Sequence, residues 1–210
     1  MLNWKNGTLK IGSATMDYIR FGNGAKILIM LPGLGDGLRS VKGTALPMAL
    51  MYREFCKDFT VYAFSRKSPL PEGYTTRDMA KDQAEAMGLL GIAKADIFGV
   101  SMGGMIAQYL AIDFPEKVNR LILTVTSARP NPLLKESVEE WVRLAKEGDH
   151  GAFMPHLLSS LHIVPEEATG TAIPAFVEVG GQHNNCLLCG WGHRFRLIAT
   201  SRDVLVALCV

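Results

Sequence analysis

A serine flanked by glycines is the feature of this sequence best suited to carry chemistry. Ser101 lies between Gly99 and Gly103 in a G-x-S-x-G pattern, and a second glycine, Gly104, follows. An apolar run precedes the pattern and a segment of helical periodicity follows it, which predicts a sharp turn from strand to helix. Glycines suit such a turn because the two backbones pass too close for a Cβ atom. The turn would expose the Ser101 hydroxyl and direct the N–H of Met102, at the helix N-terminus, toward an oxyanion.

This stretch and the residues after it resemble a known family. Gly99 to Gly104, followed by Phe114 to Val118 and Arg120 to Leu123, is similar to small members of the α/β-hydrolase superfamily. The resemblance implies a serine hydrolase that acts on a small carboxylic ester, thioester or lactone through an acyl-Ser101 intermediate. It implies no metal and no organic cofactor. A carbon–carbon hydrolase or lyase of the same fold would use the same turn, and a plain Gly-rich turn is the structural alternative.

A second glycine-rich loop precedes the serine in the chain. Residues 25–30 form an apolar run that contains one lysine, Lys26, and is typical of a buried parallel strand; the loop 31–37 follows at once. As a dinucleotide-binding fingerprint the loop fails, because the third glycine would fall on Leu38. It resembles instead the family's His-Gly-x-Gly loop, with Pro32 in place of the histidine. That resemblance implies the Leu34 N–H as the second oxyanion donor, while a simple surface turn remains the alternative.

The elements around these loops alternate between strand and helix. Apolar runs predict strands at 59–65, 95–100 and 118–127, with helices at 47–57 and after a capping box formed by Thr75 and Asp78. Residues 3–21 predict antiparallel strands with turns at 6–7 and 12–13. We therefore expect an α/β fold with a doubly wound, mostly parallel sheet and helices on both faces. Ser101 would lie at the carboxyl edge of a central strand, where such sheets bind ligands.

The pattern divides the chain into three parts. Residues 1–128 predict the α/β-hydrolase core. Residues 129–165 read as helices alone, the first capped by Ser137 and Glu140, and resemble the helical cap that many family members lay over the active site. A cap would exclude water and shape an acyl pocket. Residues 166–210 predict a short, divergent remainder of the core, so that the C-terminal part is incomplete.

The last part departs from the family pattern. All eleven lysines lie at or before Lys146, whereas all five histidines lie after Asp149. The loop around His193 resembles the family's histidine loop and makes His193 the candidate base that would activate Ser101. Asn184 stands where the family places an aspartate, and an amide at that position of a triad lowers the rate by about 10⁴. Either this is a genuine short variant, or the tail is truncated or read out of frame.

Composition excludes several other classes of protein. A chain of 210 residues with 48% hydrophobic residues and a net charge of +2 is typical of a globular domain and not of a nucleic-acid-binding or membrane-surface protein. A zinc site would need a better partner for Cys186 and Cys189 than His183 and His193 supply. With no signal peptide or membrane-spanning run, the cytoplasm is the default location. The rival hypothesis is a catalytically dead protein that binds ligands or is a damaged gene product, with an open sheet edge that favours a homodimer.

Overall fold

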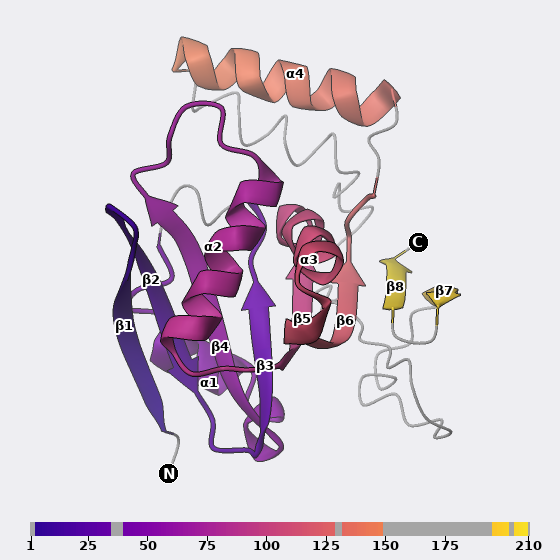
Figure 1. The fold of residues 1–210 in the computed structure, drawn as a ribbon. Helices are drawn as coiled ribbons and strands as arrows, with labels where there is room; N and C mark the ends of the chain where they lie inside the picture. Colours follow the sequence, from indigo (N-terminus) through magenta and orange to yellow (C-terminus); the bar gives the residue numbers. More distant parts are fainter. Residues whose placement is uncertain (1–2, 35–39, 129–131, 149–194, 202–203, 210) are drawn as a thin grey trace. The chain divides into compact units, whose positions relative to one another are not determined.

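The computed structural model describes residues 3–34, 40–128, 132–148, 195–201 and 204–209. Within these residues the backbone forms one mixed sheet in the strand order β1-β2-β4-β3-β5-β6-β8-β7 (Figure 1). The strands are β1 (Trp4–Ile11), β2 (Ala14–Phe21), β3 (Lys26–Leu31), β4 (Phe59–Ser68), β5 (Ala95–Val100), β6 (Val118–Thr124), β7 (Phe195–Ser201) and β8 (Val204–Cys209). The helices are α1 (Ala45–Met51), α2 (Thr76–Leu89), α3 (Met102–Asp113) and α4 (Pro132–Glu147), with 3-10 turns at Phe55–Lys57 and Pro115–Lys117.

The centre of the sheet is parallel. Strand β3 pairs in parallel with β4 on one side and β5 on the other, β5 pairs with β6, and β6 pairs with β8. The first two strands are antiparallel to each other, and β2 is antiparallel to β4. This is the doubly wound, mostly parallel sheet that the alternation of elements predicts.

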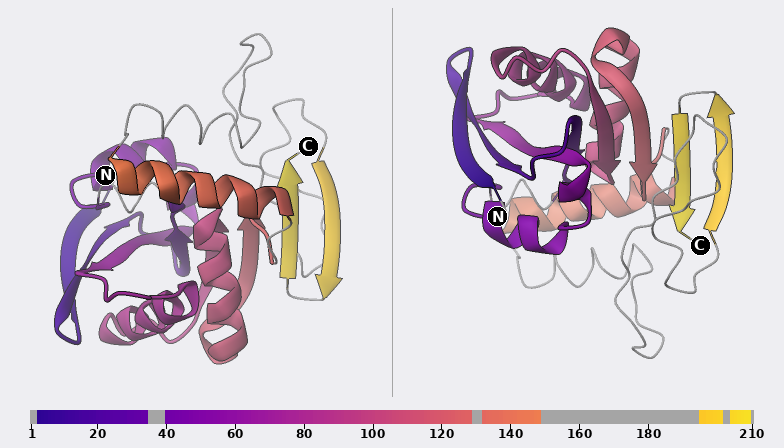
Figure 2. Two further views of the ribbon diagram at one scale, coloured as in Figure 1. Left: turned by 90° about the horizontal axis from the view of Figure 1, so that it is seen from above. Right: turned by 90° about the horizontal axis from the view of Figure 1, so that it is seen from below.

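Helices cover both faces of this sheet. The side chains of α2 and α3 pack with Ile29, Leu31 and Ile97 on one face, whereas Ala45 and Ala49 of α1 pack on the other. Figure 2, viewed from above and below, shows α1 on the opposite side of the sheet from α2 and α3. Strands β3 and β5 are neighbours, yet the next helices after them, α1 and α3, lie on opposite faces. Their carboxyl ends therefore form the crevice where open α/β sheets bind ligands.

The capping box that begins α2 is confirmed. The Thr75 side chain accepts a hydrogen bond from the Asp78 N–H, and the Asp78 carboxylate accepts one from the Thr75 N–H. Met79, Ala80, Ala84 and Met87 are buried, as their helical spacing predicts, so this face of α2 packs on the sheet.

Several predicted boundaries are wrong. Residues 6–7 lie inside β1 and form no turn, and β6 ends at Thr124, short of the predicted residue 127. The predicted helix 47–57 is the shorter α1, followed by turns and a 3-10 turn. Ser137 lies within α4, which already begins at Pro132, so it does not cap that helix.

The chain divides into two compact units, the sheet with its helices and a unit that contains α4. The expected boundaries at 128 and 165, and the role of the second part as a cap, remain predictions. Among the described residues, no helix combines the length and apolar character that crossing a bilayer requires.

Candidate active site

Ser101 occupies the strained turn that the G-x-S-x-G pattern predicts. It stands between the last residue of β5 and the first residue of α3, with φ of 53° and ψ of −121°. A positive φ is uncommon in residues other than glycine and marks backbone that the surroundings hold in place. Among the described residues, the Ser101 hydroxyl has no hydrogen-bond partner, and it does not cap α3. The side chain is half-buried, and its hydroxyl is unengaged by this part of the chain.

The glycines around Ser101 are required by space. A Cβ atom on Gly99 would lie 2.6 Å from Gly104 Cα and 2.9 Å from Ala107 Cβ. On Gly103 it would lie 2.0 Å from the carbonyl oxygen of Leu31. Helix α3 therefore begins against the backbone of both its own strand and β3, and side chains larger than hydrogen would push these elements apart.

The loop after β3 approaches Ser101 itself. A Cβ atom on Gly33 would lie 3.3 Å from Ser101 Cβ and 3.8 Å from its Oγ. Leu34, the expected second oxyanion donor, is the next residue. Met102, the other expected donor, is the first residue of α3, where a backbone N–H has no acceptor within the helix. Leu34 follows Gly33 and Met102 follows Ser101, so each predicted donor residue is next in sequence to one of the two residues in this contact.

The end of β6 fixes the Ser101 backbone from the other side. The Ser101 N–H donates to the carbonyl oxygen of Thr124 at 3.0 Å, and the Thr126 hydroxyl donates to the Ser101 carbonyl oxygen at 2.7 Å. Val125, between the two threonines, has φ of 46°, which is a rare conformation for a β-branched residue. Thr124 and Thr126, on either side of Val125, therefore both hydrogen-bond the backbone of Ser101.

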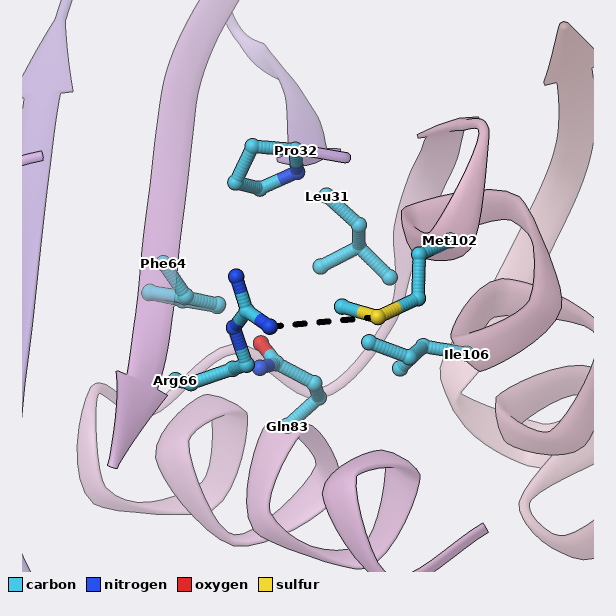
Figure 3. Close-up of a pocket in the computed structure, with 7 residues that line it drawn as sticks. All are labelled: Leu31, Pro32, Phe64, Arg66, Gln83, Met102 and Ile106. Atoms are coloured by element: carbon cyan, nitrogen blue, oxygen red, sulfur yellow. Dashed lines mark hydrogen bonds between the residues drawn. The ribbon is translucent and has the colours of Figure 1, made fainter. Parts of the chain in front are cut away.

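A pocket lies between the end of β3, strand β4, helix α2 and the first turns of α3. Figure 3 shows Arg66 of β4, Gln83 of α2 and Met102 of α3 directed into it. Its remaining lining residues are apolar: Leu31, Pro32, Phe64 and Ile106. Arg66 donates a hydrogen bond from Nη2 to the Leu34 carbonyl oxygen at 2.8 Å, and its Nη1 lies 3.8 Å from Met102 Sδ. One guanidinium therefore contacts both residues that carry the expected oxyanion donors.

The predicted base, His193, and Asn184, which stands where the family places an aspartate, lie outside the described residues. The structure thus brings together Ser101, Leu34 and Met102 with their glycines, and does not place His193 relative to them. Among the described residues, no cluster of His, Cys, Asp or Glu could hold a metal ion.

Sequence reasoning did not single out Arg66, Thr124 or Thr126. Arg66 directly follows the run 59–65 predicted as a strand. A residue at the carboxyl end of a strand in an open α/β sheet lies where ligands bind, and this position is the sequence feature that points to Arg66. The threonines act through backbone groups of Ser101, and such contacts leave no pattern in the sequence.

Known proteins resemble the chain over most of this core. The family described as alpha/beta hydrolase fold matches residues 26–154. A fluoroacetate dehalogenase from Burkholderia sp is 29% identical over 185 residues, which are 87% of this chain and 56% of the dehalogenase. A putative carbamate hydrolase RutD from Cronobacter sakazakii is 30% identical over 108 residues, which are 48% of this chain and 37% of the hydrolase. The chain thus spans only about half, or less, of the length of these relatives.

Solved structures share the fold at low sequence identity. An alpha/beta hydrolase from a Medee basin deep-sea metagenome library gives a TM-score of 0.62 at 20% identity, covering 75% of this chain and 60% of that one. A hydrolase from Pseudomonas aeruginosa PA01 gives a TM-score of 0.55 at 24% identity, covering 67% and 52%. With the serine turn, the sheet order and a family match over more than half of its residues in agreement, this chain belongs to the alpha/beta hydrolase fold family.

Proposed function

We propose that this protein is a serine hydrolase that cleaves a small carboxylic ester, thioester or lactone through an acyl-Ser101 intermediate. The observation that carries the proposal is the backbone of Ser101, held at φ of 53° at the start of α3. This conformation presents the hydroxyl beside Gly33, where the loop after β3 comes within contact distance of the serine. A carbonyl carbon attacked by Oγ would place its oxygen toward the N–H groups of Leu34 and Met102.

The proposed cycle has two halves. Ser101 Oγ bonds to the acyl carbon and the leaving alcohol or thiol departs with a proton, then water hydrolyses the acyl-serine and restores the hydroxyl. Both halves pass through a tetrahedral oxyanion, which the two N–H groups would stabilise. Both also need a base to take up and return the proton, and His193 is our candidate for this role. The helical second part would act as the cap over the acyl group.

Of the reactions for which the relatives are named, those at a carbonyl carbon suit a serine nucleophile. Displacement of a halide from carbon by a serine would leave an ether, which water does not cleave, so Ser101 does not suit the reaction that the dehalogenase is named for. A carbamate, by contrast, presents a carbonyl carbon to the nucleophile. A homoserine O-acetyltransferase from Thermus thermophilus, 41% identical over 58 residues and covering 28% of this chain, is named for the transfer of an acyl group.

The test is labelling of the purified protein with a fluorophosphonate probe, with the modified residue located by mass spectrometry. The control is Ser101→Ala, which removes Oγ. We expect labelling at Ser101 and none in the control, with hydrolysis of short-chain p-nitrophenyl esters lost in parallel. A folded protein that is not labelled, or ester hydrolysis that survives in Ser101→Ala, would contradict the proposal. The first of these results would favour the catalytically dead alternative.

A further inference from the structure

We infer that Arg66 is a positioning residue, whose guanidinium holds the oxyanion-binding loop after β3 against the start of α3. The inference rests on the proposed function of Ser101 and extends it to a residue from a third element, β4. The two contacts that define the role are the hydrogen bond from Nη2 to the Leu34 carbonyl oxygen at 2.8 Å and the approach of Nη1 to Met102 Sδ at 3.8 Å.

The first contact fixes the part of the loop that matters. The carbonyl oxygen of Leu34 belongs to the peptide that follows the Leu34 N–H, so a bond to it restricts the rotation that would turn that N–H away from Ser101. A bond from a charged donor is stronger than a neutral one, and the planar guanidinium offers further donors at a fixed angle. The sulfur contact is weaker, because a thioether is a poor acceptor, and it sets the side of Met102 against which the guanidinium lies.

Arg66 follows the alternation of β4 onto the face that carries this pocket, since Phe64, two residues earlier, lines the same pocket. A β-bulge separates Arg66 from the regular register with β2. Tyr18 pairs with Phe64 and Met16 with Lys67, so Ser65 and Arg66 together oppose the single residue Asp17. In a regular strand, neighbouring side chains point to opposite faces of the sheet. Here both Arg66 and Lys67 reach side chains of α2, because the extra residue resets the alternation. The bulge therefore turns Lys67 onto the face that Arg66 shares with Phe64, and both cations lie beside α2.

Two other polar side chains, Lys67 and Gln83, lie near the guanidinium. The neighbouring cation, Lys67, is engaged elsewhere, since its Nζ donates to Asp82 at 3.0 Å and to Tyr74 at 2.6 Å. Burial alone would lower the pKa of Lys67, but these two bonds outweigh it and raise the pKa. Across the pocket, Gln83 is 2% exposed, and its Oε1 has no hydrogen-bond partner among the described residues. A carbonyl dipole placed beside Arg66 favours the positive charge there (Figure 3).

The test compares Arg66→Met, which keeps the apolar part of the side chain and removes the guanidinium, with Arg66→Lys, which keeps the positive charge. The matched control is Arg77→Met, because Arg77 also makes two guanidinium bonds, at 2.8 and 2.7 Å to Asp113, but on the exposed surface. The measurements are the second-order rate constant of fluorophosphonate labelling, the kcat and KM of ester hydrolysis, the melting temperature, and hydrogen exchange in peptides that contain Leu34 or Met102.

We expect Arg66→Met to slow labelling and lower kcat by about 10- to 100-fold with KM little changed, because an error of about 1 Å in a catalytic group costs roughly 10² in rate. Exchange at Leu34 should accelerate, Arg66→Lys should recover part of the rate, and Arg77→Met should react as the unmodified chain does. Equal labelling rates in Arg66→Met and the unmodified chain would overturn the inference, and so would equal hydrogen exchange at Leu34 in the two. A further result would also overturn it. In that case Arg66→Met loses labelling rate only in proportion to a lowered melting temperature, while folded Arg66→Lys is labelled at the full rate.

The two proposals fail in different ways. If the unmodified, folded chain is not labelled, the proposed function fails, and hydrogen exchange at Leu34 still decides whether Arg66 anchors the loop. If the unmodified chain is labelled at Ser101 and Arg66→Met is labelled equally fast, the proposed function stands and the role of Arg66 is refuted.

Discussion

At the scale of single residues, the candidate site depends on close packing around a strained serine. Holding a residue at an unfavourable φ costs on the order of 1–3 kcal/mol, which neighbouring contacts must offset. Here the contacts are the two hydrogen bonds between the Ser101 backbone and residues Thr124 and Thr126, together with the close backbone packing that the neighbouring glycines allow. The sequence alone makes the glycines visible through their spacing. It does not reveal the threonines or Arg66, because each of them binds a main-chain oxygen or N–H that every residue possesses.

The first prediction concerns one of these glycines. Gly103→Ala places a Cβ atom 2.0 Å from the Leu31 carbonyl oxygen, so β3 and α3 must separate. We expect a loss of about 1–3 kcal/mol in the free energy of unfolding, the range found for overpacked sites, together with loss of probe labelling. Gly88→Ala is the control, since Gly88 lies in α2 with open space around it and alanine there should stabilise by up to about 1 kcal/mol. Urea denaturation measures both, and equal stability of the two variants would contradict the packing argument.

At the scale of elements, the strands at the centre of the sheet were predictable and their ends were not. Largely apolar runs identify β3 and β5, because strands buried on both faces show no alternation of apolar and polar residues. The sequence predicts a turn at residues 6–7, but Gly7 pairs with Tyr18 inside β1, where a Cβ atom would lie 2.3 Å from the tyrosine ring. The predicted end of β6 at residue 127 is wrong because Val125 has strong β propensity, which predicts a longer strand, yet its φ is 46°.

The second prediction concerns the start of α2 and its dependence on pH. Bonds from Lys81 and Thr75 lower the pKa of the Asp78 carboxyl below its usual range in the folded chain. A lowered pKa contributes stability that is present above the unfolded value, about 3.9, and is lost as the pH falls toward the folded pKa. Asp78→Asn should therefore be less stable than the unmodified chain at pH 7, with a difference that shrinks at pH 3.

The control for this measurement is Glu72→Gln, because Glu72 is exposed and has no hydrogen-bond partner among the described residues. Urea denaturation at pH 7 and pH 3 gives both differences. A deficit of Asp78→Asn that is as large at pH 3 as at pH 7 would show that the carboxylate charge is not what stabilises the helix start.

At the scale of the whole molecule, the nucleophile and its base come from different parts of the chain. Ser101 and both expected oxyanion donors lie in the loops after β3 and β5 and at the start of α3, whereas all five histidines lie from position 150 to position 193. No histidine is among the described residues, so a histidine that activates Ser101 would have to come from this later region. Sequence reasoning could locate the nucleophile because its turn is local. It could not locate the base with the same certainty, because a base is defined by a contact across the fold.

The third prediction tests whether His193 supplies that contact. His193→Ala should reduce the rate constant of fluorophosphonate labelling toward the background measured with Ser101→Ala, because an unassisted serine hydroxyl is a weak nucleophile. His183→Ala is the control, a histidine in the same region to which no catalytic role is assigned, and it should label at the unmodified rate. Both variants should keep the melting temperature of the unmodified chain.

If His183→Ala loses labelling and His193→Ala retains it, the base is a different histidine and the resemblance around position 193 is accidental. If the unmodified chain is labelled at Ser101 and neither variant changes the rate, then activation of the serine comes from a group other than these two histidines, and the remaining three become the next substitutions to make.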